Sequence, residues 1–563
     1  MKKRVSMLKR LLSCTLVTVL AAGLVACGST SADTSGQTAA SAESVQEGTE
    51  VTAAESAGSE AAAGTETAEP GEITIWFCNE GSNYEKVFDR FEELTKDTLN
   101  TKINLNWTTN HAQEMPLKLM NQEPCDLTFD AYWINMAKNI QDGLYADLSS
   151  YFNNPEYPGL QKAFTGDLLD SMYDSEGHIY AIPLLETYND SKCFFIRGDW
   201  REKYDLPEVT DEETLRLYLD TMEEHKEELG LETPVGLGNR GYFYFKYDVY
   251  TKIANNICEI DSTGARVTQQ FEVLLSDDGK TVLDANVLGD PDERFADYPE
   301  GYQSNYRTAA AIELGDDWGK YVNEDFVTAT DINVRWNNGK FAMIEGNLSG
   351  YVSTVNALQQ VDPNAKVECY FYEPQVQNME KTFSNQSFAN NYMVVPYYSE
   401  NIDRTMKFLD WIFASQENND LFHYGIEGED YELNEDGTIT ILSPDNMYSF
   451  PGYELCWNPM YYHPNSSLGE YLEYDQWSRD QANFQAHPLL GFIFNPNETT
   501  ELSTSLAAYK ALQENYYHHF MAGKYGADTE AKIQEFYEQA EPDVEVIREA
   551  LMRQVQAYLD AKN

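Results

Sequence analysis

The sequence predicts an α/β fold with parallel strand pairing, and three neighbouring segments carry this prediction. Residues Ile73–Phe77 form an apolar run typical of a buried strand. Helical spacing of apolar residues follows at Val87, Phe88, Phe91 and Leu94. Residues Ile103–Trp107 then alternate as a second strand. A strand, a helix and a strand in this order favour a parallel pair with a helical crossover.

The next elements continue this pattern. Ser82–Glu85 has the spacing of a capping box, which predicts the start of the first helix. A second helix is expected around Met115–Asn121, and Asp126–Asp130 reads as another short strand. The chain therefore returns to the same sheet after each helix.

The C-terminal part is predicted to be rich in helices. Asn401–Phe413 is amphipathic, with Met406, Leu409, Ile412 and Phe413 on its apolar side. Asn434–Gly437 is typical of a hairpin turn before the short strand Thr438–Leu442. Three helices are expected to end the sequence: Ser505–Met521, Thr529–Ala540 and Val544–Ala561.

The net charge of the chain argues against nucleic acids as partners. The 563 residues include 39 Lys and Arg against 93 Asp and Glu, which gives a formal charge of −54. A nucleic-acid-binding surface needs a basic face, so we expect no nucleic acid partner. The 38 tyrosines join flat apolar rings to polar tips, and such an excess often accompanies binding surfaces.

The first residues resemble a bacterial lipoprotein signal. Lys2, Lys3, Arg4, Lys9 and Arg10 precede the uncharged and largely apolar stretch Leu11–Val25, which is short for a membrane-spanning helix. The stretch ends in Leu24-Val25-Ala26-Cys27, which resembles a lipobox. We expect residues 1–26 to be a signal peptide and Cys27 to carry a lipid anchor. The alternative is an ordinary secretory signal with an incidental cysteine.

Residues 27–72 are expected to form a disordered tether. Beyond Cys27, this stretch is mostly Ser, Thr, Ala, Gly and Glu and has no aromatic residue, Lys or Arg, so it cannot bury enough apolar surface to fold. Removal of residues 1–26 takes away five basic residues and no acid, which makes the formal charge −59 instead of −54.

Sequence motifs of catalysis and metal binding are missing. The six remaining cysteines, at positions 78, 125, 193, 258, 369 and 456, form no CxxC pattern, and buried free thiols are the simplest expectation, although export permits disulfides. The sequence also contains no GxSxG and no HExxH motif. We therefore expect no cofactor, no metal and no enzymatic activity.

Five segments carry recognisable motifs: Gly177–Pro183, Arg197–Trp200, Gly339–Gly346, Phe408–Gly428 and Gly491–Phe494. They resemble the sugar-type extracellular solute-binding proteins that serve ABC importers, including a subgroup of lipoproteins. Each segment alone is a weak match. The order of the segments, together with the lipobox, is what makes the resemblance specific. An acidic, Tyr-rich insert between Tyr242 and Tyr306 departs from the pattern and leaves the ligand open.

The resemblance implies a two-lobe, periplasmic-binding-protein-like fold of type II, with a ligand cleft between lobes and a hinge crossed several times. Lobe one would comprise residues 73–183 and 382–425, and lobe two residues 184–381 and 426–563. It also implies ABC permease subunits in the membrane as partners, a small-molecule solute as ligand, and a location on the extracytoplasmic face of the cell membrane.

Candidate ligand contacts follow from a requirement of sugars, which need polar groups for hydroxyls and aromatic planes for the ring face. Strand ends and the predicted crossings supply such residues, each of which has packing or a solvated loop as its alternative role. The candidates are Trp76, Asn79, Glu80, Asp130, Tyr132, Trp133, Glu186, Tyr188, Tyr242, Tyr244, Asn347, Asn385 and Trp457.

These patterns predict a lipid-anchored binding protein that delivers a saccharide to an ABC importer. The ligand could instead be a peptide or another polar solute. A surface-displayed glycoside hydrolase and an adhesin are alternatives from other classes.

Overall fold

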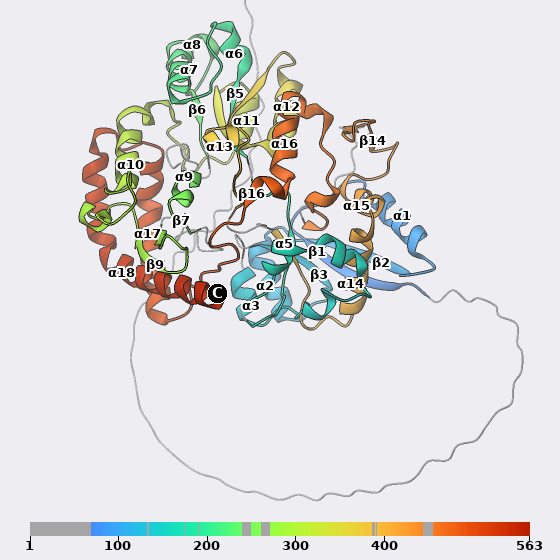
Figure 1. Cartoon of the computed structure of the whole chain (residues 1–563). Coiled ribbons are helices and arrows are strands. Elements are labelled where there is room, and N and C mark those ends of the chain that lie inside the picture. Colours follow the sequence, from blue (N-terminus) through green and yellow to red (C-terminus); the bar gives the residue numbers. More distant parts are fainter. Residues whose placement is uncertain are drawn as a thin grey trace, which may run out of the picture. The chain divides into compact units, whose positions relative to one another are not determined.

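The computed structural model describes residues 69–562, except for 132–133, 135, 175, 190, 239–248, 261–270, 386–388, 390 and 443–453. The predicted signal peptide, Cys27 and nearly all of the predicted tether lie outside these residues and stay predictions. Residues Ala68–Asn563 form one unit, whose elements are labelled in Figure 1.

Five strands form the first sheet, in the order β2-β1-β3-β13-β4. Their bounds are β1 (Gly71–Phe77), β2 (Thr101–Trp107), β3 (Leu127–Ala131), β13 (Asn391–Val394) and β4 (Ile182–Leu184). Strand β1 pairs in parallel with both β2 and β3, which confirms the predicted parallel unit. Strand β13 is antiparallel to β3 and β4, so the sheet is mixed.

Helices α1 (Glu85–Thr95) and α14 (Ile402–Ala414) pack together beside this sheet (Figure 1). The Phe91 and Phe408 rings meet edge to face with centroids 5.3 Å apart. All four apolar residues expected on α14 are buried. The other helices of this part are α2 (His111–Met120), α3 (Met136–Gln141), α4 (Pro158–Ala163), α5 (Gly166–Asp170) and α15 (Gln416–His423).

The second sheet has four strands in the order β11-β5-β10-β6. They are β11 (Val367–Tyr370), β5 (Lys192–Arg197), β10 (Met343–Asn347) and β6 (Val235–Gly236). Strand β10 is antiparallel to β5 and parallel to β6. The helices of this part are α6 (Gly198–Lys203), α7 (Glu212–Glu224), α8 (Lys226–Leu229), α11 (Ile332–Asn337), α12 (Tyr351–Val361), α13 (Pro374–Gln377) and α16 (Leu472–Arg479).

A third group of elements surrounds a small antiparallel sheet of β7 (Ile257–Glu259), β8 (Glu272–Leu275) and β9 (Val282–Asn286). Helices α17 (Thr500–Met521) and α18 (Thr529–Lys562) lie side by side in Figure 1 and share one apolar cluster with this sheet. Helices α9 (Val249–Ala254) and α10 (Tyr306–Asp317) complete the group. The described part of the acidic insert therefore packs against the C-terminal helices.

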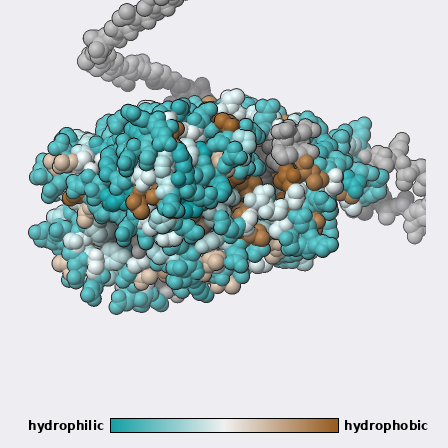
Figure 2. Space-filling view, turned by 90° about the horizontal axis from the view of Figure 1, so that it is seen from above, coloured by the Kyte–Doolittle hydropathy of each residue, from teal (hydrophilic) through white to brown (hydrophobic). Residues whose placement is uncertain are grey.

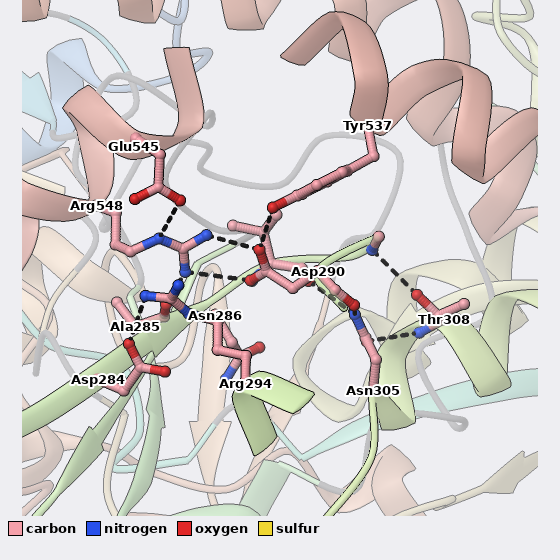
Figure 3. Close-up of polar contacts among 12 residues, drawn as sticks. Asp284, Ala285, Asn286, Asp290, Arg294, Asn305, Thr308, Tyr537, Glu545 and Arg548 are labelled. Carbon is pink, nitrogen blue, oxygen red and sulfur yellow. Dashed lines mark hydrogen bonds and ion pairs between the residues drawn. The ribbon is translucent and has the colours of Figure 1, made fainter. Parts of the chain in front are cut away.

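A buried ionic cluster joins the insert to α18 (Figure 3). The Asp290 carboxylate pairs with the Arg548 guanidinium at 2.6 Å and accepts a hydrogen bond from the Tyr537 hydroxyl at 2.7 Å. It also accepts one from the Val287 backbone N–H at 2.7 Å. The Asp290 and Arg548 side chains are 0% and 2% exposed. Each buried charge thus has an opposite charge and hydrogen bonds, as a dry interior requires.

Two short strand pairs lie outside these sheets. β12 (Thr382–Phe383) pairs with β16 (Phe484–Gln485), and β14 (Tyr431–Leu433) pairs with β15 (Ile439–Ile441). The β14–β15 connection confirms the predicted turn, because the Gly437 N–H donates to the Asn434 carbonyl oxygen at 3.0 Å.

Two predictions about helix ends are wrong. The first helix begins at Glu85, so Glu85 is its first residue and not its third, and the expected capping box from Ser82 to Glu85 is out of register. The last two predicted helices are one, because α18 continues through Pro542. Phe536, Ala540, Val544 and Ile547 are all buried along one face, so packing on either side of the proline offsets the hydrogen bond that it cannot donate.

The face shown in Figure 2 is mostly hydrophilic, with small hydrophobic patches. Among the helices of the described part, none combines the length and apolarity needed to cross a bilayer. The six cysteines after Cys27 form no disulfide with one another: Cys125, Cys193, Cys258 and Cys456 are buried, and Cys78 and Cys369 are half-buried.

Candidate functional site

Polar side chains gather where the strands of the first sheet end. Strands β1 and β3 are parallel and end at Phe77 and Ala131. At the same edge, Asn391 of β13 pairs with both Ala131 and Leu184. Ligands of open α/β folds bind outside the carboxyl ends of such strands. This edge is therefore one side of the candidate site.

The second sheet offers a matching edge. Strands β6 and β10 are parallel and end at Gly236 and Asn347. Asn347 pairs with Lys192, the first residue of β5. Residues 185–191, which we call the first crossing, join Leu184 of the first edge directly to Lys192 of the second. The two strand-end edges thus meet at this crossing.

Hydrogen bonds hold the first crossing to two other parts of the chain. Residues 371–390, the second crossing, run from β11 to β13, and their Asn385 N–H donates to the Tyr188 carbonyl oxygen at 3.1 Å. The Tyr188 N–H donates to the Ser478 carbonyl oxygen of α16 at 2.9 Å. The Tyr188 ring also stacks on Phe484 of β16. Segments distant in sequence thus converge beside the candidate site.

Arg479, at the end of α16, is a buried cation in this junction. It donates to the Glu186 carbonyl oxygen at 2.6 Å and pairs with the Asp475 carboxylate at 3.0 Å. Its guanidinium carbon lies 3.2 Å from the centroid of the Tyr462 ring. Burial lowers the pKa of nearby His423 to about 3, and the charge of Arg479 acts in the same direction. The junction therefore holds its positive charge on Arg479 and keeps His423 neutral.

Asn79 and Trp76, predicted at the end of β1, both have partners within the chain. The Asn79 side-chain amide donates to the Glu454 carboxylate at 2.8 Å. That carboxylate is fully buried and also accepts from the Cys78 N–H at 2.8 Å. The Trp76 indole N–H donates to the Pro124 carbonyl oxygen at 3.0 Å, and Lys118 lies over the ring. Glu80 is exposed. Their contact with a ligand stays a prediction.

Asp130 lies at the end of β3 and is 2% exposed. Its carboxylate accepts hydrogen bonds from the Asn139 amide at 2.8 Å, from the Tyr145 hydroxyl and from the Ala131 N–H at 2.7 Å. These bonds fix the carboxylate at the strand end. Its neighbours Tyr132 and Trp133 lie outside the described residues.

The other candidates occupy both edges and the crossings. Glu186 and Tyr188 lie in the first crossing, and Asn385 lies in the second. Asn347 is exposed at the end of β10, where its side chain accepts from the Gly350 N–H at 3.1 Å. Trp457 is half-buried against the core around the first sheet. Tyr242 and Tyr244 lie outside the described part of the chain.

The stretch after residue 425 also contacts elements near the first sheet. Lys86 of α1 pairs with Asp430 at 2.6 Å, and the Asn458 amide donates to the Ala163 carbonyl oxygen at 3.0 Å. These contacts describe neighbours of single residues, and the predicted lobe boundaries stay predictions.

Three polar residues of these edges were absent from the candidates: Glu454, Arg479 and Glu345. Glu454 and Arg479 lie in stretches without a recognisable strand, so the sequence held no signal for them. The sequence did contain a signal for Glu345, because strand spacing places it on the same face as Met343 and Asn347, near the end of a segment already singled out.

No family model matches the chain, and no curated protein matches it either. Solved structures do. The N-glycan transport solute binding protein NgtS from Streptococcus pneumoniae is 18% identical, with a TM-score of 0.63 over 88% of this chain and 100% of that one. An HMO-binding, ABC-transporter-associated solute binding protein from Bifidobacterium longum infantis is 14% identical, with a TM-score of 0.58 over 88% and 99%. The alginate-binding protein AlgQ2 is 13% identical, with a TM-score of 0.54 over 88% and 99%.

These likenesses extend over nearly the whole of each compared protein and over 88% of this chain. The two sheets of this chain, which the two crossings connect, agree with a fold of two lobes. The chain therefore has the two-lobe α/β fold of the solute-binding proteins of ABC transporters.

Proposed function

We propose that this protein is a lipid-anchored, extracytoplasmic binding protein that captures a saccharide and delivers it to an ABC importer. The observation that carries the proposal is the shared fold, because the similar structures above are named for binding N-glycan, HMO or alginate. The protein then acts by binding and release instead of catalysis.

The two edges suit this role. Ligand that touches both edges is held best when the lobes close on it, so closure reports occupancy to a transporter. Asn79, Asp130 and Asn385 offer amides and a carboxylate for hydroxyls, and the predicted aromatic residues offer planes for the ring face. The strongly negative charge disfavours anionic solutes.

A thermal-shift screen of neutral oligosaccharides and of matched peptides tests the ligand class. A ligand at a hundred times its Kd adds about 2.7 kcal/mol to the free energy of unfolding, which is a clear shift. Stabilisation by peptides alone would contradict the saccharide proposal. Hydrolysis of the sugar during the assay would favour a glycoside hydrolase.

Calorimetry on two variants tests the site. We expect Asp130→Ala and Trp133→Ala each to weaken saccharide binding about tenfold or more, which corresponds to about 1.4 kcal/mol. Asp130→Asn is the matched variant, because it keeps the size and one hydrogen-bond acceptor. If both alanine variants bind as the parent does, the predicted site is wrong.

Metabolic labelling with a fatty acid tests the anchor. We expect the label to disappear in Cys27→Ala and to persist in Cys78→Ala, which removes a cysteine outside the signal-like region. Label that persists in Cys27→Ala would contradict the predicted lipobox.

A further inference from the structure

Strand β10 changes character along one face as it approaches the second edge. Met343 is fully buried, whereas Glu345 and Asn347, at the next positions on the same face, are exposed. Ile344, on the opposite face, is buried in the core. The sheet therefore delivers a carboxyl group to the strand end that meets the first crossing.

Tyrosines and a lysine surround this carboxyl group. Glu345 pairs across the sheet with Phe194, whose ring packs on Tyr372 with centroids 5.3 Å apart. Burial is the main cause that raises the pKa of the Tyr372 hydroxyl, and the charge of Glu345 is the next largest cause. The titratable groups around these two residues are Lys192 and Cys193 of β5, Glu373 after β11 and Tyr250 of α9.

The Tyr250 ring belongs to the same edge as the crossing. Its hydroxyl accepts a hydrogen bond from the side-chain amide of Asn189, which is fully buried in the first crossing. Asn189 in turn accepts from the Ser191 N–H at 2.9 Å. Tyr250 and Glu345 both act on the pKa of Tyr372, so Tyr372 links this network to the surroundings of the carboxyl group.

Glu345 itself has no hydrogen bond or ion pair with another described residue. Its side chain is accessible to solvent, yet the surrounding protein displaces enough water to raise the pKa of its carboxyl to about 7, against the opposing charge of Lys192.

Resting on the proposed function, we propose that Glu345 is the ligand-contacting carboxylate of the second edge and accepts hydrogen bonds from hydroxyl groups of a neutral polyhydroxylated ligand. Tyrosine rings and the Asn189–Tyr250 network suit sugar rings and their hydroxyls. The positive charge of Lys192 opposes that of the Glu345 carboxylate, so this pair does not require a cationic ligand.

Calorimetry with Man5GlcNAc, chitotetraose and its cationic deacetylated form tests the proposal. We expect Glu345→Gln to weaken binding of the neutral probe that the parent binds by about tenfold or more. Glu227→Gln, an exposed acid on α8, removes the same charge and should leave the affinity unchanged. The melting temperature of each variant shows whether it is folded.

A second readout does not depend on any variant. Hydroxyl donors favour the charged carboxylate, so ligand binding should lower the pKa of Glu345 and release protons at pH 7. Titrations in two buffers of different ionisation enthalpy measure this release, which Glu345→Gln should abolish and Glu227→Gln should retain.

The outcomes separate the two proposals. If the parent binds a neutral saccharide and Glu345→Gln binds it equally well, or if the parent releases no protons, the role of Glu345 is wrong and the proposed function stands. Preference for the cationic probe also contradicts the role of Glu345. If the parent binds no saccharide of a broad screen, both proposals fail.

Discussion

Asp290 and Glu345 are both acids that the protein surrounds, but their partners differ. Asp290 has the Arg548 guanidinium, the Tyr537 hydroxyl and a backbone N–H within hydrogen-bond distance. Glu345 has no such partner among the described residues, and its pKa is raised to about 7. The paired acid joins two elements, whereas the unpaired acid is kept at a strand-end edge where stability alone does not explain it.

The largest effect is expected from breaking the Asp290–Arg548 pair. Arg548→Ala leaves a buried carboxylate without its cation and should lower the free energy of unfolding by about 3–5 kcal/mol. Arg553→Ala is the matched control, because Arg553 is 55% exposed and pairs with Glu498 on the surface; it should cost about 0–1 kcal/mol. Chemical denaturation measures both, and equal losses would remove the distinction between buried and exposed pairs.

His487 adds a third case to the comparison of Asp290 with Glu345: a buried titratable group that stays neutral. Burial lowers its pKa to about 3, and the charge of Lys562 adds to this effect. Because the unfolded chain then binds more protons, stability should fall as the pH drops from about 6.5 towards 3, by about 1.4 kcal/mol per pH unit for this residue.

His487→Asn tests this slope. The asparagine oxygen replaces the ring nitrogen that accepts from the Leu489 N–H at 3.0 Å, but it does not titrate. Unfolding of parent and variant between pH 6.5 and pH 5 should show a shallower slope in the variant. Parallel slopes would mean that His487 is protonated in the folded protein.

Glu345→Gln should have a smaller effect on stability, of opposite sign to that of Arg548→Ala. A raised carboxyl pKa means that the folded chain binds more protons, so its stability falls as the pH rises from about 4.5 through 7. The variant removes this loss, and its melting temperature at pH 8 should be equal to or above that of the parent. A clear decrease would show that the carboxylate has a structural partner.

Deletion of Ala32–Thr67 should have the smallest effect. This composition cannot pack, so the melting temperature and the ligand affinity of the remaining body should not change. Deletion of a stretch of equal length that includes β1 is the contrasting case and should prevent folding. A lower melting temperature after the tether deletion would mean that the segment docks on the body.

Regular elements of the first sheet could be predicted because their patterns are long. Strands β1 to β3 and helix α14 repeat apolar residues at strand or helix spacing, and each was recognised within a few residues. Strands β6, β12 and β16 have two residues each, too few to show a period. Pattern analysis could therefore find neither β6 of the second sheet nor the β12–β16 pair.

The candidate site was predictable at strand ends and not beyond them. Asn79 was expected, but the buried carboxylate of Glu454 that holds it lies 375 residues away in the sequence. Arg479 meets Glu186 from a distance of 293 residues. Local pattern cannot reveal such pairs, because they form only when the crossings bring remote segments together.

The order of strands in the first sheet has a consequence for folding during synthesis. Strand β13 lies between β3 and β4, yet it begins at Asn391 and is therefore synthesised long after Ala131. Until then the edge of β3 stays open, and open edges of emerging chains pair readily with other chains. The non-local pairing also slows folding. A chain with this topology gains from a chaperone that shields β3 until β13 is available.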